Sequence, residues 1–76
     1  MAIFARYWVD VRDPREDWME VPGSSSDFRK YTTGWFDALT SFKYHFSHRL
    51  MCEDKHTGVI SVIESRYAKR KPLKKR

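Results

Sequence analysis

Alternating polar and apolar positions predict an extended strand at the start of the chain. Over residues 3–12 the odd-numbered side chains fall on one side of an extended backbone, and the even-numbered side brings together Phe4, Arg6, Trp8, Asp10 and Arg12. A proline-containing turn at residues 13–17 precedes a short β-prone run at residues 18–21. The pattern therefore predicts a β-hairpin, and the small polar residues at 22–27 predict an exposed loop after it.

A helical period follows the loop. Thr32 or Thr33 can cap a helix, and large apolar side chains then recur at spacings of four, three, four and four. Phe36 widens the resulting stripe, which consists of Trp35, Leu39, Phe42, Phe46 and Leu50. We expect one helix that ends near residues 52–54. The β-branched run at residues 59–67 predicts the last strand.

The expected order of elements is strand, strand, helix, strand, which predicts an α+β fold. The helix and an antiparallel sheet of about three strands must cover each other, because neither layer buries its apolar face alone. One face of the sheet then packs against the helix, and the other stays open. Arginines beside large aromatic side chains make that open face a candidate contact surface, because stacking and charge-assisted hydrogen bonds both strengthen interfaces.

Length and composition limit the chain to one small domain, which we place at residues 1–68. The 76 residues, of which 41% are hydrophobic and 16% aromatic, suffice for one core. The single cysteine, Cys52, excludes an internal disulfide and favours a reducing, cytoplasmic compartment. No stretch approaches the ~18 apolar residues of a membrane span, so we expect no membrane partner. We also expect a monomer.

Positive charge is concentrated at the C-terminus. The net charge is +5, and six cations lie in the last eight positions: Lys69, Arg70, Lys71, Lys74, Lys75 and Arg76. The rest of the chain has nine cations and ten acids, a net charge of −1. We expect residues 69–76 to form a basic tail with no fold of its own, which either keeps the protein soluble or attracts nucleic acid or an acidic protein surface.

Four potential metal ligands recur at helical spacing: His45, His48, Cys52 and His56. A continuous helix would spread them over roughly 16 Å, whereas zinc holds each ligand at about 2.0–2.3 Å. We therefore predict no metal site and no cofactor. The same histidines with Glu53, Asp54 or Asp37 have the residue types of a small ribonuclease. No phosphate-binding glycine loop or nucleophile motif accompanies them, so we predict no catalytic residues and no enzyme activity.

Four short motifs carry a resemblance to a phage family: Tyr7-Trp8-Val9-Asp10-Val11, Trp18-Met19-Glu20-Val21-Pro22, Phe36-Asp37-Ala38-Leu39 and Ser65-Arg66-Tyr67. In this pattern the chain resembles the small inhibitors of bacterial RNA polymerase that phages such as T7 encode. Those proteins are also short strand, strand, helix, strand domains with an arginine in the last strand. The resemblance implies a host-takeover protein that binds RNA polymerase or another host protein, with Arg66 as a contact residue. The basic tail and the long connection at residues 23–33 depart from that pattern.

The leading hypothesis is a non-enzymatic protein that docks on a macromolecular machine that handles nucleic acid. Its expected partner-binding side chains are Arg6, Trp8, Arg12 and Arg66, and the basic tail adds long-range attraction. The first alternative is direct binding of nucleic acid, with the basic tail attracting phosphates and Phe4, Trp8 or Tyr67 stacking on unpaired bases. The second alternative is the small ribonuclease.

Overall fold

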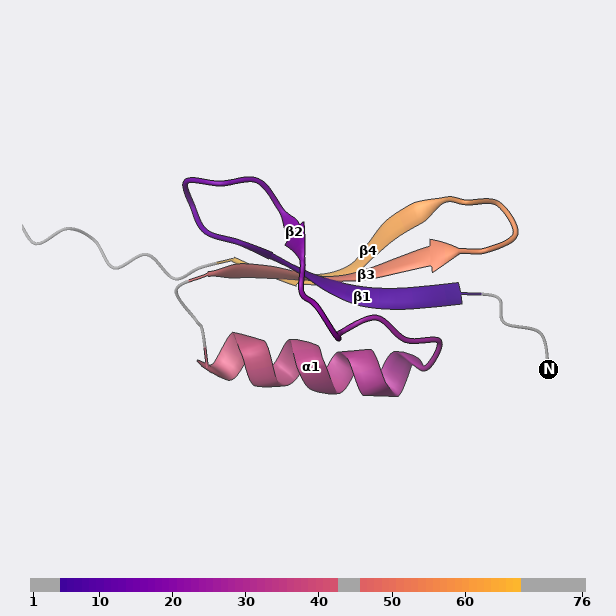
Figure 1. Ribbon diagram of the computed structural model, residues 1–76, viewed down its shortest axis with the longest axis horizontal. Helices are drawn as coiled ribbons and strands as arrows, with labels where there is room; N and C mark the ends of the chain where they lie inside the picture. Colours follow the sequence, from indigo (N-terminus) through magenta and orange to yellow (C-terminus); the bar gives the residue numbers. More distant parts are fainter. Residues whose placement is uncertain (1–4, 43–45, 68–76) are drawn as a thin grey trace, which may run out of the picture.

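The computed structural model describes residues 5–42 and 46–67, and these residues form one helix and four strands (Figure 1). The elements follow one another as β1 (Ala5–Arg12), β2 (Met19–Glu20), α1 (Arg29–Phe42), β3 (Ser47–Asp54) and β4 (Ile60–Arg66). The predictions on Phe4, on His45 and on the basic tail at residues 69–76 lie outside the described residues.

The four strands form one antiparallel sheet in the order β2-β1-β3-β4. All of β1 pairs with all of β3, from Ala5 opposite Asp54 to Arg12 opposite Ser47. The register between β3 and β4 shifts at Leu50 and Met51, because β4 contains one extra residue there, a β-bulge. The helix lies along one face of the sheet (Figure 1). The α+β fold class is thus confirmed, and the sheet has one strand more than the sequence pattern predicted.

The additional strand, β3, occupies a segment that the sequence pattern predicted to be helical. The helix was expected to reach residues 52–54, but α1 ends at Phe42 and Leu50 lies in β3. As a strand, residues 47–54 bury His48 and Leu50 on the face toward α1. Strand pairing prevails over the helical period because β3 forms backbone pairs with a neighbour on each side.

Both ends of α1 differ from the prediction. The helix begins at Arg29, ahead of the expected cap at Thr32. The hydroxyl of Thr32 is buried inside the structure and donates a hydrogen bond of 2.9 Å to the carbonyl oxygen of Ser24. Phe42 was expected in the core, but it is the last helical residue and is 77% exposed, past the turns that face the sheet. Its assignment to the core was therefore wrong.

A small apolar cluster lies between α1 and the sheet. Val9, Phe36 and Leu50 are at most 1% exposed, and four partly buried side chains pack around them: Val21, Trp35, Leu39 and Ile63. Val9 belongs to the odd-numbered side of β1, so this side faces the helix. The even-numbered side is consequently the face without a helix.

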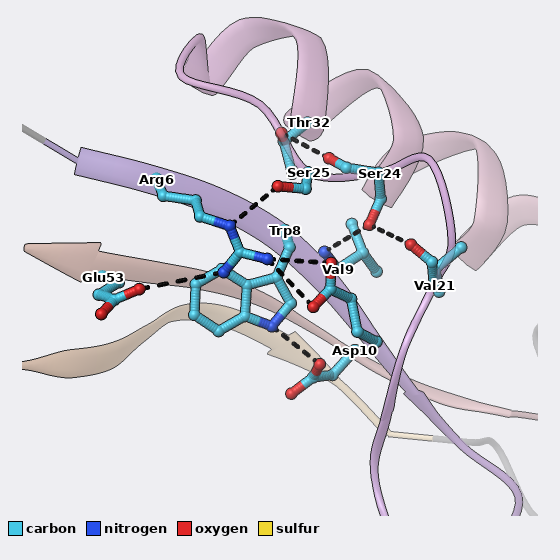
Figure 2. Close-up of polar contacts among 10 residues, drawn as sticks. Arg6, Trp8, Val9, Asp10, Val21, Ser24, Ser25, Thr32 and Glu53 are labelled. Atoms are coloured by element: carbon cyan, nitrogen blue, oxygen red, sulfur yellow. Dashed lines mark hydrogen bonds and ion pairs between the residues drawn. The ribbon is translucent and has the colours of Figure 1, made fainter. Parts of the chain in front are cut away.

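The loop after β2 closes the outer edge of β1. The backbone amide of Val9 donates to the hydroxyl oxygen of Ser24 at 3.0 Å, and Tyr7 exchanges two backbone hydrogen bonds of 2.8 and 2.9 Å with Ser26. Ser24 also accepts the hydrogen bond from Thr32 of α1 (Figure 2). The loop therefore joins the helix to the sheet and covers backbone groups of β1 that β3 does not reach.

Candidate functional site

The sheet face opposite α1 carries the most concentrated group of charged and aromatic side chains among the described residues. Residues that are opposite each other in antiparallel strands share a face, so the register places β3 side chains beside the even-numbered ones of β1. We call this surface the open sheet face and define it by Arg6, Trp8, Asp10, Arg12, Trp18, Glu20, Arg49, Met51 and Glu53.

Trp8 lies on the expected face but is not an exposed side chain. The guanidinium carbon of Arg6 lies 4.4 Å from the centre of the Trp8 ring, and only 7% of Trp8 is exposed. The indole Nε1 donates a hydrogen bond of 2.9 Å to Oδ1 of Asp10 (Figure 2). Trp8 is thus fixed at its polar edge and covered on one ring face, an arrangement that satisfies a buried indole.

Arg6 is held in place by acceptors from three segments of the chain. Its Nη2 donates to both carboxylate oxygens of Glu20 at 3.1 Å, and its Nε donates to the hydroxyl of Ser25 at 3.0 Å. A carboxylate oxygen of Glu53 lies 4.0 Å from Nη1 (Figure 2). These contacts connect β1, β2, β3 and the loop, and they keep the guanidinium over Trp8.

A second arginine stacks on a tryptophan farther along the open sheet face. The guanidinium carbon of Arg49 lies 3.9 Å from the centre of the Trp18 ring, and its Nη2 donates to Oδ2 of Asp10 at 3.0 Å. Asp10 therefore joins the two stacks, because its other carboxylate oxygen accepts from Trp8. Arg12 lies 5.9 Å from the same Trp18 ring and donates from Nε to the carbonyl oxygen of Glu16 at 2.9 Å.

The charges of the open sheet face balance. Three arginines and three carboxylates contribute to it: Arg6, Arg12, Arg49, Asp10, Glu20 and Glu53. Both arginines that stack closest on tryptophan have a carboxylate within 4.0 Å. The formal net charge of the surface is consequently zero, which differs from the excess of cations that attracts a phosphate backbone.

Arg66 lies on the other face of the sheet, apart from the three residues predicted to act with it. Strict alternation along β4 would place Arg66 on the same face as Ile60 and Val62, but the bulge adds a residue at Ile63 and reverses the faces after it. Its guanidinium lies 4.9 Å from the ring centre of Phe36 and donates to the hydroxyl of Thr40 at 2.9 Å. Arg66 thus connects β4 to α1.

The expected arrangement of metal ligands on a helix is wrong, because the segment is a strand followed by a turn. His48 and Cys52 are four residues apart on one face of β3, which separates them by roughly 13 Å. His56 lies in the turn between β3 and β4. Within residues 5–42 and 46–67, no group of three or more His, Cys, Asp or Glu side chains is placed to hold a metal ion.

Sequence reasoning missed Trp18 and Arg49 as parts of the surface. Alternation placed Asp10 on the same side as Trp8, but Asp10 was not counted among the partner-binding residues. Arg49 could not be assigned because its segment was predicted to be helical. Trp18 precedes a strand of only two residues, so its face was not defined by alternation.

The helix of the described region has 14 residues, and no helix there is long and apolar enough to cross a bilayer. Comparison with protein-family models, curated proteins and solved structures finds no match to this chain. The geometry of the open sheet face is accordingly the basis for a functional proposal.

Proposed function

We propose that the protein is a non-enzymatic binding protein that docks through the open sheet face on a macromolecular machine that handles nucleic acid. The supporting observation is the pair of stacks, Arg6 on Trp8 and Arg49 on Trp18, which Asp10 joins. Arginine and tryptophan are enriched among the residues that dominate interface energies, and Arg6, Arg49 and Trp18 are the partly exposed members of the two stacks. Because their acceptors already hold these side chains, docking orders few additional rotamers and loses less entropy.

The charge balance favours a protein partner over direct binding of nucleic acid. A phosphate backbone is attracted by uncompensated cations, whereas Arg6 and Arg49 have carboxylate partners. Stacking on an unpaired base requires an accessible aromatic ring. Trp8 is 7% exposed under Arg6, and Arg49 covers one side of the Trp18 ring. A protein surface that offers both charged and apolar groups matches this network better.

Bacterial RNA polymerase is the first candidate target, and inhibition of host transcription by a phage-encoded protein is the corresponding activity. This choice rests on the resemblance in motifs and element order to the phage inhibitors. The cations at residues 69–76 would speed association with an acidic surface at long range. We assign Arg66 a structural role, because its contacts with Phe36 and Thr40 join β4 to the helix.

Binding of the full chain to immobilised bacterial RNA polymerase tests the proposal. Arg12→Ala and Trp18→Ala should each weaken binding about tenfold or more, because each removes a large side chain from the docking surface. Arg29→Ala is the matched control, since Arg29 is an exposed arginine on α1 and should not change binding. Inhibition of transcription in vitro should follow the same order. Equal binding by all three variants would contradict the assignment of the surface.

The nucleic-acid alternative is tested in the same assay with single- and double-stranded oligonucleotides at two salt concentrations. A variant with glutamine at all six tail cations separates the tail from the folded domain. On our proposal this variant associates more slowly with the polymerase but still binds it. Tight oligonucleotide binding with a log-log salt slope of up to about −5, lost in the glutamine variant, would contradict the proposal if no polymerase binding is found.

A different machine as the target would also be recognisable. A partner recovered from a bacterial lysate after nuclease treatment, and lost with Trp18→Ala, would keep the docking surface and replace the polymerase as its target.

A further inference from the structure

We propose that two copies of the chain pair through their β4 strands and form a symmetric dimer with one continuous sheet. β4 is the outer strand of the described sheet, beside β3 on one side only. The backbone N–H and C=O groups on the outer side of such a strand are a template for pairing with another strand. This inference goes beyond the proposed function and replaces the expectation of a monomer.

The first residues of β4 and the residue before it expose three β-branched side chains. Val59 is 59% exposed, Ile60 55% and Val62 46%. Ile60 and Val62 are opposite Glu53 and Met51 of β3, so both belong to the side of the sheet without the helix. Monomeric proteins usually protect an edge strand with charges, proline or a covering segment. Residues 59–62 contain neither a charged residue nor a proline.

The opposite edge of the sheet is protected, and this difference determines the symmetry. β2 has only two residues and is followed closely by Pro22, and the loop at Ser24 and Ser26 bonds to the outer side of β1. A head-to-tail array would require β4 of one copy to pair with that covered edge of the next. When β4 of one copy pairs with β4 of a second copy, both free edges are occupied, and the assembly stops at a dimer.

In one register of the two β4 strands, side chains on the same face of the sheet lie opposite each other and the apolar ones are in contact. A twofold axis through Ser61 sets Ile60 opposite Val62 of the second copy, and both side chains are on the face without the helix. It also sets Val59 opposite Ile63, which packs against the core on the helix side. Exposed apolar groups then cover one another on the open face, and the serine at the axis introduces no charge repulsion.

The bulge argues against the neighbouring registers. An axis through Val62 would set Ile60 against Glu64, and an axis through Ile63 would set Val62 against Glu64. Glu64 is opposite Leu50 and therefore points to the helix side, so both registers would oppose side chains from different faces. The paired segment is short, and we expect a weak dimer whose population rises with protein concentration.

Sedimentation equilibrium of the full chain over about a hundredfold range of concentration tests the dimer. The average mass should rise from 9.2 kDa toward twice that value. Val62→Lys should keep the mass at that of the monomer, because it places a charge in the apolar contact. Met19→Lys is the matched control: Met19 is 58% exposed on β2 at the protected edge, and this variant should dimerise normally.

Two results of the sedimentation experiment would contradict the proposed β4 interface. A mass that stays at 9.2 kDa over the whole range would overturn the proposal and leave the edge open to a strand of another protein. Unchanged dimerisation of Val62→Lys, with a native circular dichroism spectrum, would place the interface elsewhere. If Val62→Lys does not fold, Ile60→Lys provides the same test at the other side chain of the predicted contact.

Cysteine cross-linking tests the register without a charge substitution. In a Cys52→Ser background, Ser61→Cys should give a disulfide-linked dimer on mild oxidation, since residues facing across an antiparallel pair have Cα atoms about 4.5–5.5 Å apart. Ser65→Cys is the control, because the two copies of residue 65 would be roughly 26 Å apart. Equal cross-linking of both variants would show non-specific collision and overturn the register.

Discussion

The two faces of the sheet bury their large side chains by different means. On one face α1 covers Val9 and Leu50, and Phe36 of the helix fills the space between the layers. On the other face Trp8 and Met51 are also nearly buried, at 7% and 6% exposure, although no helix of the described region lies over them. Over Trp8 the side chain of Arg6, held by Glu20, takes the place of a second layer. The side chains on a sheet face can therefore be buried even where no helix covers that face.

This difference predicts two kinds of response to substitution. The helix-covered face is stabilised by non-directional apolar burial, so the loss should follow the volume removed. The open sheet face is stabilised by directed hydrogen bonds and ion pairs, so the loss should depend on which acceptor is removed and whether its donors find another. Substitutions on each face can separate these two mechanisms.

The largest expected effect is that of Phe36→Ala on the helix-covered face. Phe36 is fully buried between the layers, and truncation leaves a cavity that costs about 3–5 kcal/mol. A core of this size supplies only roughly that amount of net stability, so the variant should be unfolded at room temperature. Circular dichroism during urea titration measures this. Phe36→Leu, which keeps most of the volume, should remain folded, and a cooperative transition of Phe36→Ala near that of the wild type would contradict the assigned core.

A smaller effect is expected for Asp10→Ala on the open sheet face. The substitution removes the acceptor of both Trp8 Nε1 and Arg49 Nη2, and we expect it to lower the free energy of unfolding by about 2–3 kcal/mol. Asp10→Asn retains an amide oxygen for Trp8 but loses the charge, and should cost about half as much. A double-mutant cycle with Arg49→Ala should give a favourable coupling energy. Additive effects of the two substitutions would show that the ion pair does not stabilise the fold.

Local alternation predicted the parts of the fold in which one period is unambiguous. The strand over Ala5–Arg12, its division into two faces and the strand over Ile60–Arg66 follow from polarity and β-branching alone. Those features also placed Arg6, Trp8 and Arg12 on one surface. The segment around β3 could not be assigned in the same way, because its apolar positions continue the helical period and show no alternation that would indicate a strand instead. Pairing with β1 and β4 decides between the two, and such pairing is not visible in a local pattern.

The same limit applied to the candidate site. Arg66 was expected to bind the partner together with Arg6, but a single bulge in β4 reverses the faces of the residues that follow it. Alternation cannot reveal a bulge unless the partner strand is known. Arg49 and Trp18 come from β3 and from the approach to β2, and only the folded sheet brings them to Asp10. The sequence therefore predicted that arginine and tryptophan line the surface, but it did not predict all of these arginines and tryptophans correctly.

The smallest expected effect distinguishes the structure from the sequence pattern at a single residue. The helical period placed Phe42 in the core, where truncation would cost about 3–5 kcal/mol. In the structure Phe42 is 77% exposed at the end of α1, so Phe42→Ala should change the free energy of unfolding by less than about 0.5 kcal/mol. Leu39→Ala is the matched control one turn earlier, since Leu39 packs against the core and should cost about 2 kcal/mol. If Phe42→Ala were as destabilising as Leu39→Ala, the exposed position of Phe42 at the end of α1 would be wrong.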